Sequence, residues 1–172
     1  VLRTGNGPFT IEQLTLAEHR PDEVVVRMVA AGMCHTDLLS RELPPDFFAG
    51  PTVYGHEGAG VVEAIGESVT AVAVGDHVVL SFNSCGDCLA CNQGRLPYCF
   101  NLNQYNMSGG RPDGTASFVD ADDARVNSHF FGQSSFASHS VVAETSCVKI
   151  DPSYDLRKLG PLGCGIQTGA GA

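Results

Sequence analysis

The 172-residue chain contains no tryptophan and few basic residues. Ten Lys and Arg residues against nineteen Asp and Glu residues give a formal net charge of −9. A nucleic-acid partner would require basic patches, so we expect none. No apolar run approaches the roughly 20 residues that span a bilayer, so we expect no membrane partner and a cytoplasmic location.

Seven cysteines stand out in this otherwise ordinary composition. Four of them follow the spacing C-x2-C-x2-C-x7-C, namely Cys85, Cys88, Cys91 and Cys99. Zn²⁺ favours four soft ligands in a tetrahedron, and closed four-cysteine sites of this kind are structural. The surrounding loop has no room for a core of its own, so a metal would hold it in place of hydrophobic burial. We therefore predict a structural zinc lobe over residues 83–103.

The alternatives for this cluster are two disulfides, an iron–sulfur cluster or free thiols. An odd cysteine total and the absence of a secretory pattern argue against disulfides. The usual iron–sulfur spacings differ from this one. Structural zinc is the interpretation that the spacing favours.

The rest of the sequence is typical of a mainly β fold. Short apolar, β-branched stretches bounded by turn residues favour a compact, Greek-key-like barrel or sandwich. We expect strands at residues 23–30, 59–65, 76–82, 136–142 and 147–150. We expect short helices at residues 35–42 and 155–159, and the start of another at 163–172.

A second constellation is dispersed along the chain. Cys34 lies in GMCHTD, His56 in GHEGAG and Cys164 in PLGCGIQTG. Two Cys and one His form the ligand set of a catalytic zinc site that keeps its fourth position open. The three residues are far apart in sequence, so only a fold could unite them. Taken singly, a Cys is usually a small buried apolar residue, and a His is usually a satisfied polar one.

These motifs, with VGDHV and the four-cysteine loop between them, occur in one order over essentially the whole chain. In this they resemble the zinc-dependent medium-chain alcohol dehydrogenases, specifically their N-terminal GroES-like catalytic domain. HFFGQSSFA and LGPLGCGIQTGAGA are most similar to the aryl-alcohol (benzyl-alcohol) branch. The resemblance implies one domain over residues 1–172, a partly open β-barrel that carries the zinc lobe and a few short helices.

The resemblance also implies an activity. The whole protein would oxidise a primary, aromatic alcohol to the aldehyde by hydride transfer to NAD. Its partners would be the small alcohol and aldehyde, two Zn²⁺ per chain, and further copies of itself in a dimer or tetramer. Two other dehydrogenase activities stay open, glutathione-dependent formaldehyde oxidation and aliphatic alcohol oxidation. A non-catalytic, zinc-stabilised barrel that acts as a scaffold is the alternative from a different class.

The resemblance assigns a role to each candidate residue. The catalytic zinc is held by Cys34, His56 and Cys164. Glu57 is a carboxylate able to approach the metal, and Asp37 accepts a hydrogen bond from the far nitrogen of His56. Thr36 hydrogen-bonds the substrate oxygen and takes its proton. The alternative roles are helix capping for Thr36 and Asp37 and a buried ion pair for Glu57.

Cofactor and substrate contacts follow from the same resemblance. His35 would face the cofactor pyrophosphate and Thr168 the nicotinamide. Leu39 stands where many relatives carry a proton-relaying histidine, so the proton would leave through His35 or through the cofactor ribose and water. The substrate pocket would be lined by Phe82, Phe130 and Phe131. Core packing is the alternative for these phenylalanines.

One part of the family pattern is missing from the chain. The family binds NAD through a Rossmann unit with a G-x-G-x-x-G turn after a strand, and no such turn is present here. The glycines near 163–171 have no approaching strand. We therefore expect the chain to be a fragment that lacks the Rossmann domain and is inactive on its own.

Overall fold

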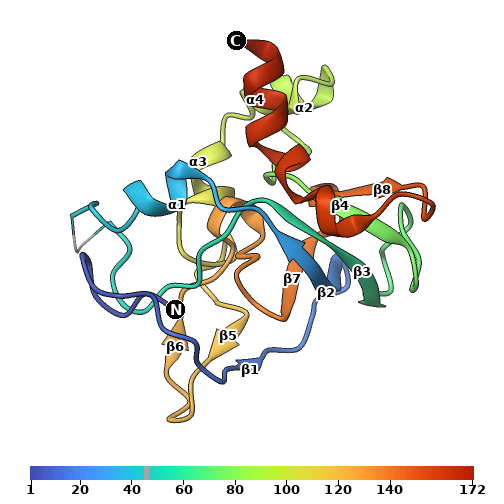
Figure 1. The fold of residues 1–172 in the computed structure, drawn as a ribbon. Coiled ribbons are helices and arrows are strands. Elements are labelled where there is room, and N and C mark those ends of the chain that lie inside the picture. Colours follow the sequence, from blue (N-terminus) through green and yellow to red (C-terminus); the bar gives the residue numbers. More distant parts are fainter. Residues whose placement is uncertain (45–46) are drawn as a thin grey trace.

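A computed structural model describes residues 1–44 and 47–172, and it is built from two antiparallel sheets (Figure 1). The larger sheet has the order β7-β2-β3-β4-β8, and the smaller one the order β1-β5-β6. The strands are β1 (Thr15–Leu16), β2 (Glu23–Ala31), β3 (Gly58–Ile65), β4 (His77–Leu80), β5 (Phe118–Val119), β6 (Arg125–Val126), β7 (His139–Ala143) and β8 (Cys147–Ile150). Within the described residues the larger sheet does not close on itself, so the barrel is partly open.

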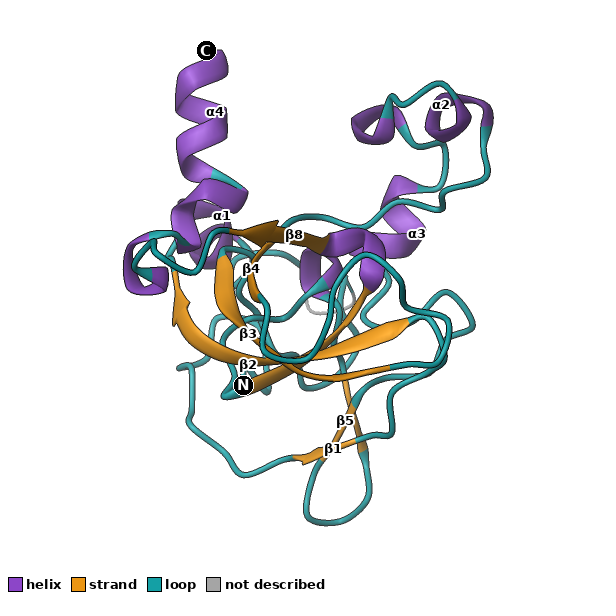
Figure 2. Ribbon diagram, turned by 90° about the vertical axis from the view of Figure 1, so that its right-hand side faces the viewer, coloured by secondary structure: helices purple, strands orange, loops and turns teal. Residues whose placement is uncertain are grey.

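The helices are short. The α-helices are α1 (His35–Leu39), α2 (Leu89–Asn92), α3 (Leu102–Asn106) and α4 (Gly165–Gly171). The 3₁₀ turns are η1 (Leu96–Tyr98), η2 (Phe130–Gly132), η3 (Glu144–Ser146), η4 (Leu156–Lys158) and η5 (Gly160–Gly163). The lobe with α2 and helix α4 extend from the same end of the barrel (Figures 1 and 2). Within the described part of the chain, no helix is both long and apolar enough to cross a membrane.

The core lies on one face of the larger sheet. β2 reads EVVVRMVAA, and its Val24 and Val26 are fully buried on the same face because alternate residues of a strand point the same way. They pack with buried side chains of the neighbouring strands, among them Val62, Val78 and Val142. Each buried valine contributes about 1.5–3 kcal/mol relative to exposure, so this cluster fixes the register that positions both ends of β2.

The sequence predictions located the long strands and missed the short ones. β2, β3, β4 and β8 lie where the apolar runs predict them. β7 begins at His139, three residues later than expected, because the Phe136 N–H bonds to the Tyr54 carbonyl outside the sheet. The first helix ends at Leu39 instead of residue 42. β1, β5 and β6 have two residues each, too few for any periodicity to show.

A buried ion pair fastens the loop after α3 to the start of β2. The Glu23 carboxylate accepts two hydrogen bonds from the Arg111 guanidinium, from Nε at 2.6 Å and from Nη2 at 2.8 Å. It also accepts one from the Arg20 N–H at 2.9 Å. Burial opposes the charged form of Glu23, but its contacts with Arg111 and His129 outweigh this and lower its pKa to about 2.

We expect Glu23→Gln to lower the free energy of unfolding at pH 7 by about 3–5 kcal/mol, because Arg111 would stay buried without its counter-ion. A lowered carboxyl pKa stabilises the fold above its ordinary value of 4.5, and this stabilisation is lost as the pH falls towards about 2. Urea unfolding of both proteins should therefore show a difference that shrinks between pH 5 and about pH 2. A difference that stays constant over this range would contradict the assignment.

Candidate metal centres

The four-cysteine lobe brings four sulfur atoms together. Their Sγ atoms all lie within 4.8 Å of one another, and they come from Cys85, Cys88, Cys91 and Cys99. The Sγ of Cys85 lies 3.4 Å from that of Cys99 and 3.9 Å from that of Cys91. Backbone donors also point inward, since the Phe100 N–H lies 3.5 Å from the Sγ of Cys88.

The electrostatics of this group suit a cation. Backbone N–H groups of Cys91 and Phe100 lower the pKa of Cys88 to about 6. Desolvation and the neighbouring thiols raise the pKa of Cys91 to about 12. Four thiolates at this spacing repel one another, so they cannot all ionise unless a cation lies among them. Four closely spaced sulfur donors are the chemistry of a closed zinc site, and the residues therefore fit the metal.

A second group forms where three separate segments meet. Cys34 precedes α1, His56 and Glu57 precede β3, and Cys164 lies between η5 and α4. One ligand atom from each of these four residues lies within 4.8 Å of all the others. The pairing of β2 with β3 produces this meeting, because the Gly32 N–H bonds to the Glu57 carbonyl at 2.9 Å just beyond the ladder.

Asp37 links two members of this group. Its Oδ2 accepts a hydrogen bond from the Cys34 N–H at 3.1 Å. Its Oδ1 accepts one from the Gly55 N–H at 3.1 Å and lies 3.1 Å from Nδ1 of His56. The carboxylate is buried, so one side chain both closes the first turn of α1 and fixes the His56 ring. A carboxylate on the far nitrogen of a histidine is the usual partner of a metal ligand.

The other nitrogen of His56 has no partner. Nε2 is fully buried, and within the described residues it makes no hydrogen bond. A buried polar atom without a partner costs about 1–3 kcal/mol, so such an atom facing two thiols and a carboxylate calls for a cation. The donor set of two sulfurs, one imidazole and one carboxylate fits Zn²⁺.

Gly55 allows the backbone to present His56 in this way. Its φ is +94°, and a Cβ there would lie 2.4 Å from the backbone nitrogen of Phe136. Only glycine tolerates both the left-handed backbone and this close approach. The glycine of the GHEGAG motif before His56 is therefore required by geometry.

Charges around His56 favour an ionised thiol beside it. Burial lowers the pKa of His56, but the hydrogen bond and charge of Asp37 outweigh it, so the pKa is raised. Burial raises the pKa of Cys34, but hydrogen bonds from Thr36 and the charge of the nearby His56 outweigh it, so the pKa is lowered. Thr36 Oγ1 lies 3.6 Å from the Cys34 Sγ. Glu57 is also anchored, because its Oε1 accepts a hydrogen bond from the Gly165 N–H at 2.7 Å.

An apolar cavity of about 320 Å³ lies beside this group. Its lining residues are Phe82, Pro97, Leu102, Asn103, Asn106, Met107 and Phe131. The Phe131 ring centroid lies 4.7 Å from that of His56, so the cavity and the metal-ligand group share a wall. Phe130 is 1% exposed and packs on Tyr54 at a centroid distance of 4.8 Å, on the core side of Phe131.

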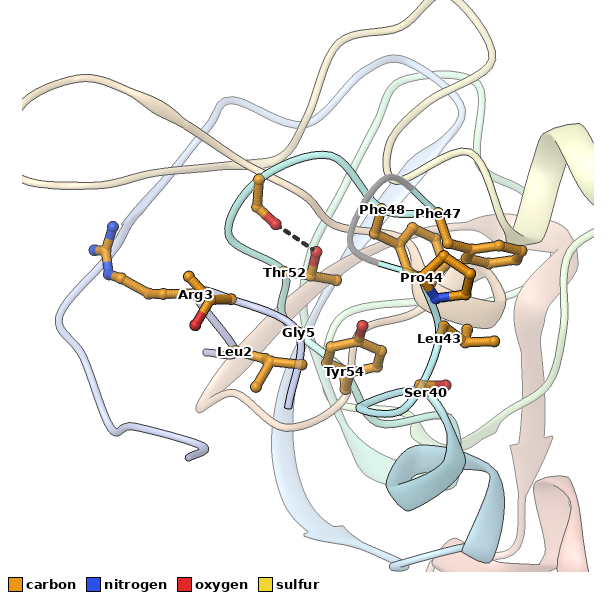
Figure 3. Close-up of a pocket in the computed structure, with 12 residues that line it drawn as sticks. Leu2, Arg3, Gly5, Ser40, Leu43, Pro44, Phe47, Phe48, Thr52 and Tyr54 are labelled. Carbon is orange, nitrogen blue, oxygen red and sulfur yellow. Dashed lines mark hydrogen bonds between the residues drawn. The ribbon is translucent and has the colours of Figure 1, made fainter. Parts of the chain in front are cut away.

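Another cavity, shown in Figure 3, lies between the N-terminal segment and the chain that follows α1. Ser40, Phe48 and Tyr54 are among the residues that line it. Its lining includes none of the cysteines or histidines of either ligand group. The lining of the cavity next to Phe131 includes none of them either, but its Phe131 packs on His56, so this cavity is the one placed for chemistry at the second group.

The remaining candidates lie on the outside of the domain. His35 is the first residue of α1 and is exposed, and Leu39, at the last position of α1, is 49% exposed. Thr168 is exposed on α4, and its N–H bonds to the Cys164 carbonyl at 2.9 Å.

A partly open antiparallel barrel with two such ligand groups, one of them beside an apolar cavity, is the architecture of a metal-binding catalytic domain. Residues 20–152 match the family described as the alcohol dehydrogenase GroES-like domain. The chain belongs to this family, the GroES-like domain of the zinc-dependent medium-chain alcohol dehydrogenases. This confirms the family and the fold class that the motifs predicted.

Its relatives are longer proteins. The chain is 45% identical over 172 residues to geraniol dehydrogenase of Castellaniella defragrans, covering 100% of this chain and 46% of that protein. It is 40% identical to S-(hydroxymethyl)glutathione dehydrogenase of Candida maltosa over 96% of this chain and 43% of that protein. The crystal structure of benzyl alcohol dehydrogenase from Acinetobacter calcoaceticus superposes with a TM-score of 0.90 at 44% identity, covering 99% of this chain and 45% of that one. The chain thus spans a little under half the length of these relatives.

Sequence reasoning missed the lobe's share of the cavity. Most of the cavity wall comes from residues that follow the third or the fourth cysteine of the lobe in sequence. They are Pro97, Leu102, Asn103, Asn106 and Met107. Their spacing has no period that points at a pocket, because the sharp turns of the lobe decide where they face. The one available signal was the apolar Leu102 and Met107 in a polar stretch immediately after Cys99.

Proposed function

We propose that this chain is the catalytic domain of an NAD-linked, zinc-dependent dehydrogenase that oxidises a primary aromatic alcohol to the aldehyde. One observation carries the proposal: the unpartnered Nε2 of His56 faces Cys34, Cys164 and Glu57 next to an apolar cavity. Residues 1–172 would form one domain with the lobe at 83–103, and the remainder of the protein would supply the Rossmann domain. The whole protein would assemble as a dimer or tetramer.

Each ligand group would hold one Zn²⁺. The four cysteines of the lobe would hold a structural ion, and Cys34, His56 and Cys164 a catalytic one, with Glu57 close enough to contact it. Zn²⁺ in the second group would supply Lewis acidity, which lowers the pKa of an alcohol hydroxyl and stabilises charge on its oxygen.

The residues around the second group would orient the substrate and move its proton. Thr36 Oγ1, 3.6 Å from the Cys34 Sγ, would accept the hydroxyl proton of the alcohol. Asp37 would keep the His56 ring in one tautomer and one orientation. Phe82 and Phe131 would exclude water and pack against the alcohol's ring.

The cofactor would approach from the side of α1 and α4, where His35 and Thr168 are exposed. NAD would accept the hydride from the alcohol carbon. His35 would contact the pyrophosphate and Thr168 the nicotinamide. Leu39, which lies on α1 with His35, is apolar and cannot carry a proton. The proton accepted by Thr36 would therefore leave through His35 or through the cofactor ribose and water.

The cavity composition favours an aromatic or similarly apolar alcohol over a glutathione adduct. A glutathione adduct carries two carboxylates, and no Arg or Lys is among the lining residues of this cavity. A volume of about 320 Å³ exceeds what a short aliphatic alcohol can fill. A non-catalytic scaffold would need the lobe group alone, and it gives no reason for the second group.

The proposal is tested on the intact protein that contains this chain. We expect elemental analysis to give about two zinc ions per chain. The absorbance of NADH measures the oxidation rate. We expect kcat/KM for benzyl alcohol to be at least about 10-fold higher than for ethanol. S-(hydroxymethyl)glutathione serves as the competing substrate. One zinc ion per chain with no oxidation of any alcohol would support the non-catalytic scaffold instead. A higher kcat/KM for S-(hydroxymethyl)glutathione would support a glutathione-dependent formaldehyde dehydrogenase.

A further inference from the structure

We propose that Asn106 is a positioning residue that sets the shape of the alcohol cavity by closing the base of the four-cysteine lobe. The inference rests on the proposed function, since it assigns selectivity to the same cavity. Asn106 is the last residue of α3 and is 2% exposed.

Asn106 joins the two ends of the lobe. Its Oδ1 accepts a hydrogen bond from the Asn83 N–H at 2.8 Å, and its Nδ2 donates to the Asn83 carbonyl at 2.8 Å. Nδ2 also donates to the Leu102 carbonyl at 2.7 Å, one turn earlier in α3. These bonds use the amide's two N–H donors and its oxygen. The side chain therefore has no donor left for a ligand, and besides forming part of the cavity wall it acts through what it holds in place.

Asn83 links the segments that carry residues of the cavity lining. It directly follows Phe82, which lines one wall, and its Oδ1 accepts a hydrogen bond from Thr145 Oγ1 at 2.8 Å. Gly132, which follows Phe131, approaches so closely that a Cβ on it would lie 2.8 Å from the Asn83 Cβ. Its φ of +73° also requires glycine.

The bond between Asn106 and Asn83 therefore fixes one cavity wall relative to the others. Leu102, Asn103 and Met107 line the cavity from α3 or next to it, while Phe82 and Phe131 line it from the segments just before Asn83 and Gly132. Without the amide of Asn106, the backbone of the lobe would connect α3 to the segment that contains Phe82. A wall displaced by about 1 Å can cost about 100-fold in rate for a substrate that fills the cavity.

The test compares a large and a small alcohol in the intact protein. For Asn106→Ala we expect KM for benzyl alcohol to rise at least about 10-fold, because the ring touches the displaced wall. For ethanol, which leaves most of the cavity empty, kcat and KM should change less than about 2-fold, and the zinc content should stay at that of the wild type. Thr145→Val removes the hydrogen bond that Thr145 donates to Asn83, with little change in side-chain shape. It should raise KM for benzyl alcohol by about 3-fold.

The matched control is Gln104→Ala, on the same helix. Gln104 is exposed, and its one side-chain bond goes to the Pro112 carbonyl at 3.3 Å, away from the cavity lining. It should keep the wild-type preference. If both alcohols lose activity in proportion, or the preference is unchanged in Asn106→Ala and Thr145→Val, the inference is wrong while the proposed function stands. If the wild-type protein oxidises neither alcohol, both are wrong.

Discussion

On the proposed function, replacing Cys164 by alanine should remove one of two zinc ions per chain and lower kcat/KM for alcohol oxidation by about 1,000-fold or more. The residue is half-buried at the start of α4, outside the main core cluster, so its loss should leave the barrel intact. The remaining members of the group would be Cys34, His56 and Glu57, and the loss of one of the two thiolates should weaken zinc binding. Zinc content and steady-state kinetics of the intact protein measure the two effects together.

The chain offers a matched control in Cys147. It is also half-buried, and it belongs to neither ligand group. Burial and the nearby Glu144 raise its pKa to about 12, so it stays a neutral thiol in β8. Cys147→Ala should keep both zinc ions and activity within about 2-fold of the wild type. If Cys164→Ala keeps both ions as well, Cys164 is not a zinc ligand.

Asp37 gives a graded version of the same experiment. Asp37→Asn keeps the shape of the side chain but weakens its hold on Nδ1 of His56. Changes to such supporting carboxylates lower metal affinity or activity by about 10–100-fold. The intermediate size of the loss would separate support of the ligand from direct ligation.

The ligand groups were more predictable from the sequence than the cavity was. Four cysteines in one short loop reveal their site through spacing alone, because chain geometry keeps them close in any compact fold. Cys34, His56 and Cys164 are more than 100 residues apart at the extremes, and only the motif resemblance joined them before the structure did. Their meeting depends on the β2–β3 register and on Gly55, which no local pattern encodes.

Side-chain direction was the part that the sequence could not supply. Phe130 and Phe131 are adjacent and identical, yet Phe131 lines the cavity while Phe130 is 1% exposed in the core. The cause is the backbone at Phe131, whose φ of +49° interrupts the turn and turns the two rings in different directions. The ring planes stand at 85°, a relation that no alternation rule predicts.

The lobe should depend on its metal for its structure. Its buried side chains are few among residues 83–103, namely Asn83, Ser84, Ala90, Cys91 and Cys99, and the first two are polar. Several of its apolar side chains are exposed, namely Leu89 at 63%, Leu96 at 42%, Tyr98 at 66% and Phe100 at 71%. Hydrophobic burial therefore cannot hold the loop, whereas structural zinc binding contributes about 10–16 kcal/mol.

Replacing Cys91 by alanine should therefore unfold the lobe and leave the barrel folded. Arg95 is the one Lys or Arg between residues 83 and 103, so an Arg-specific protease reports the opening at a single bond. We expect cleavage after Arg95 at least about 100-fold faster than in the wild type, with loss of one zinc ion. Cys164→Ala, which loses the other ion, should keep the lobe resistant, and Arg95→Gln should abolish the cut in the Cys91→Ala background. Wild-type resistance of Cys91→Ala would mean that the lobe is held by its hydrogen bonds, such as those of Asn106, and not by a metal.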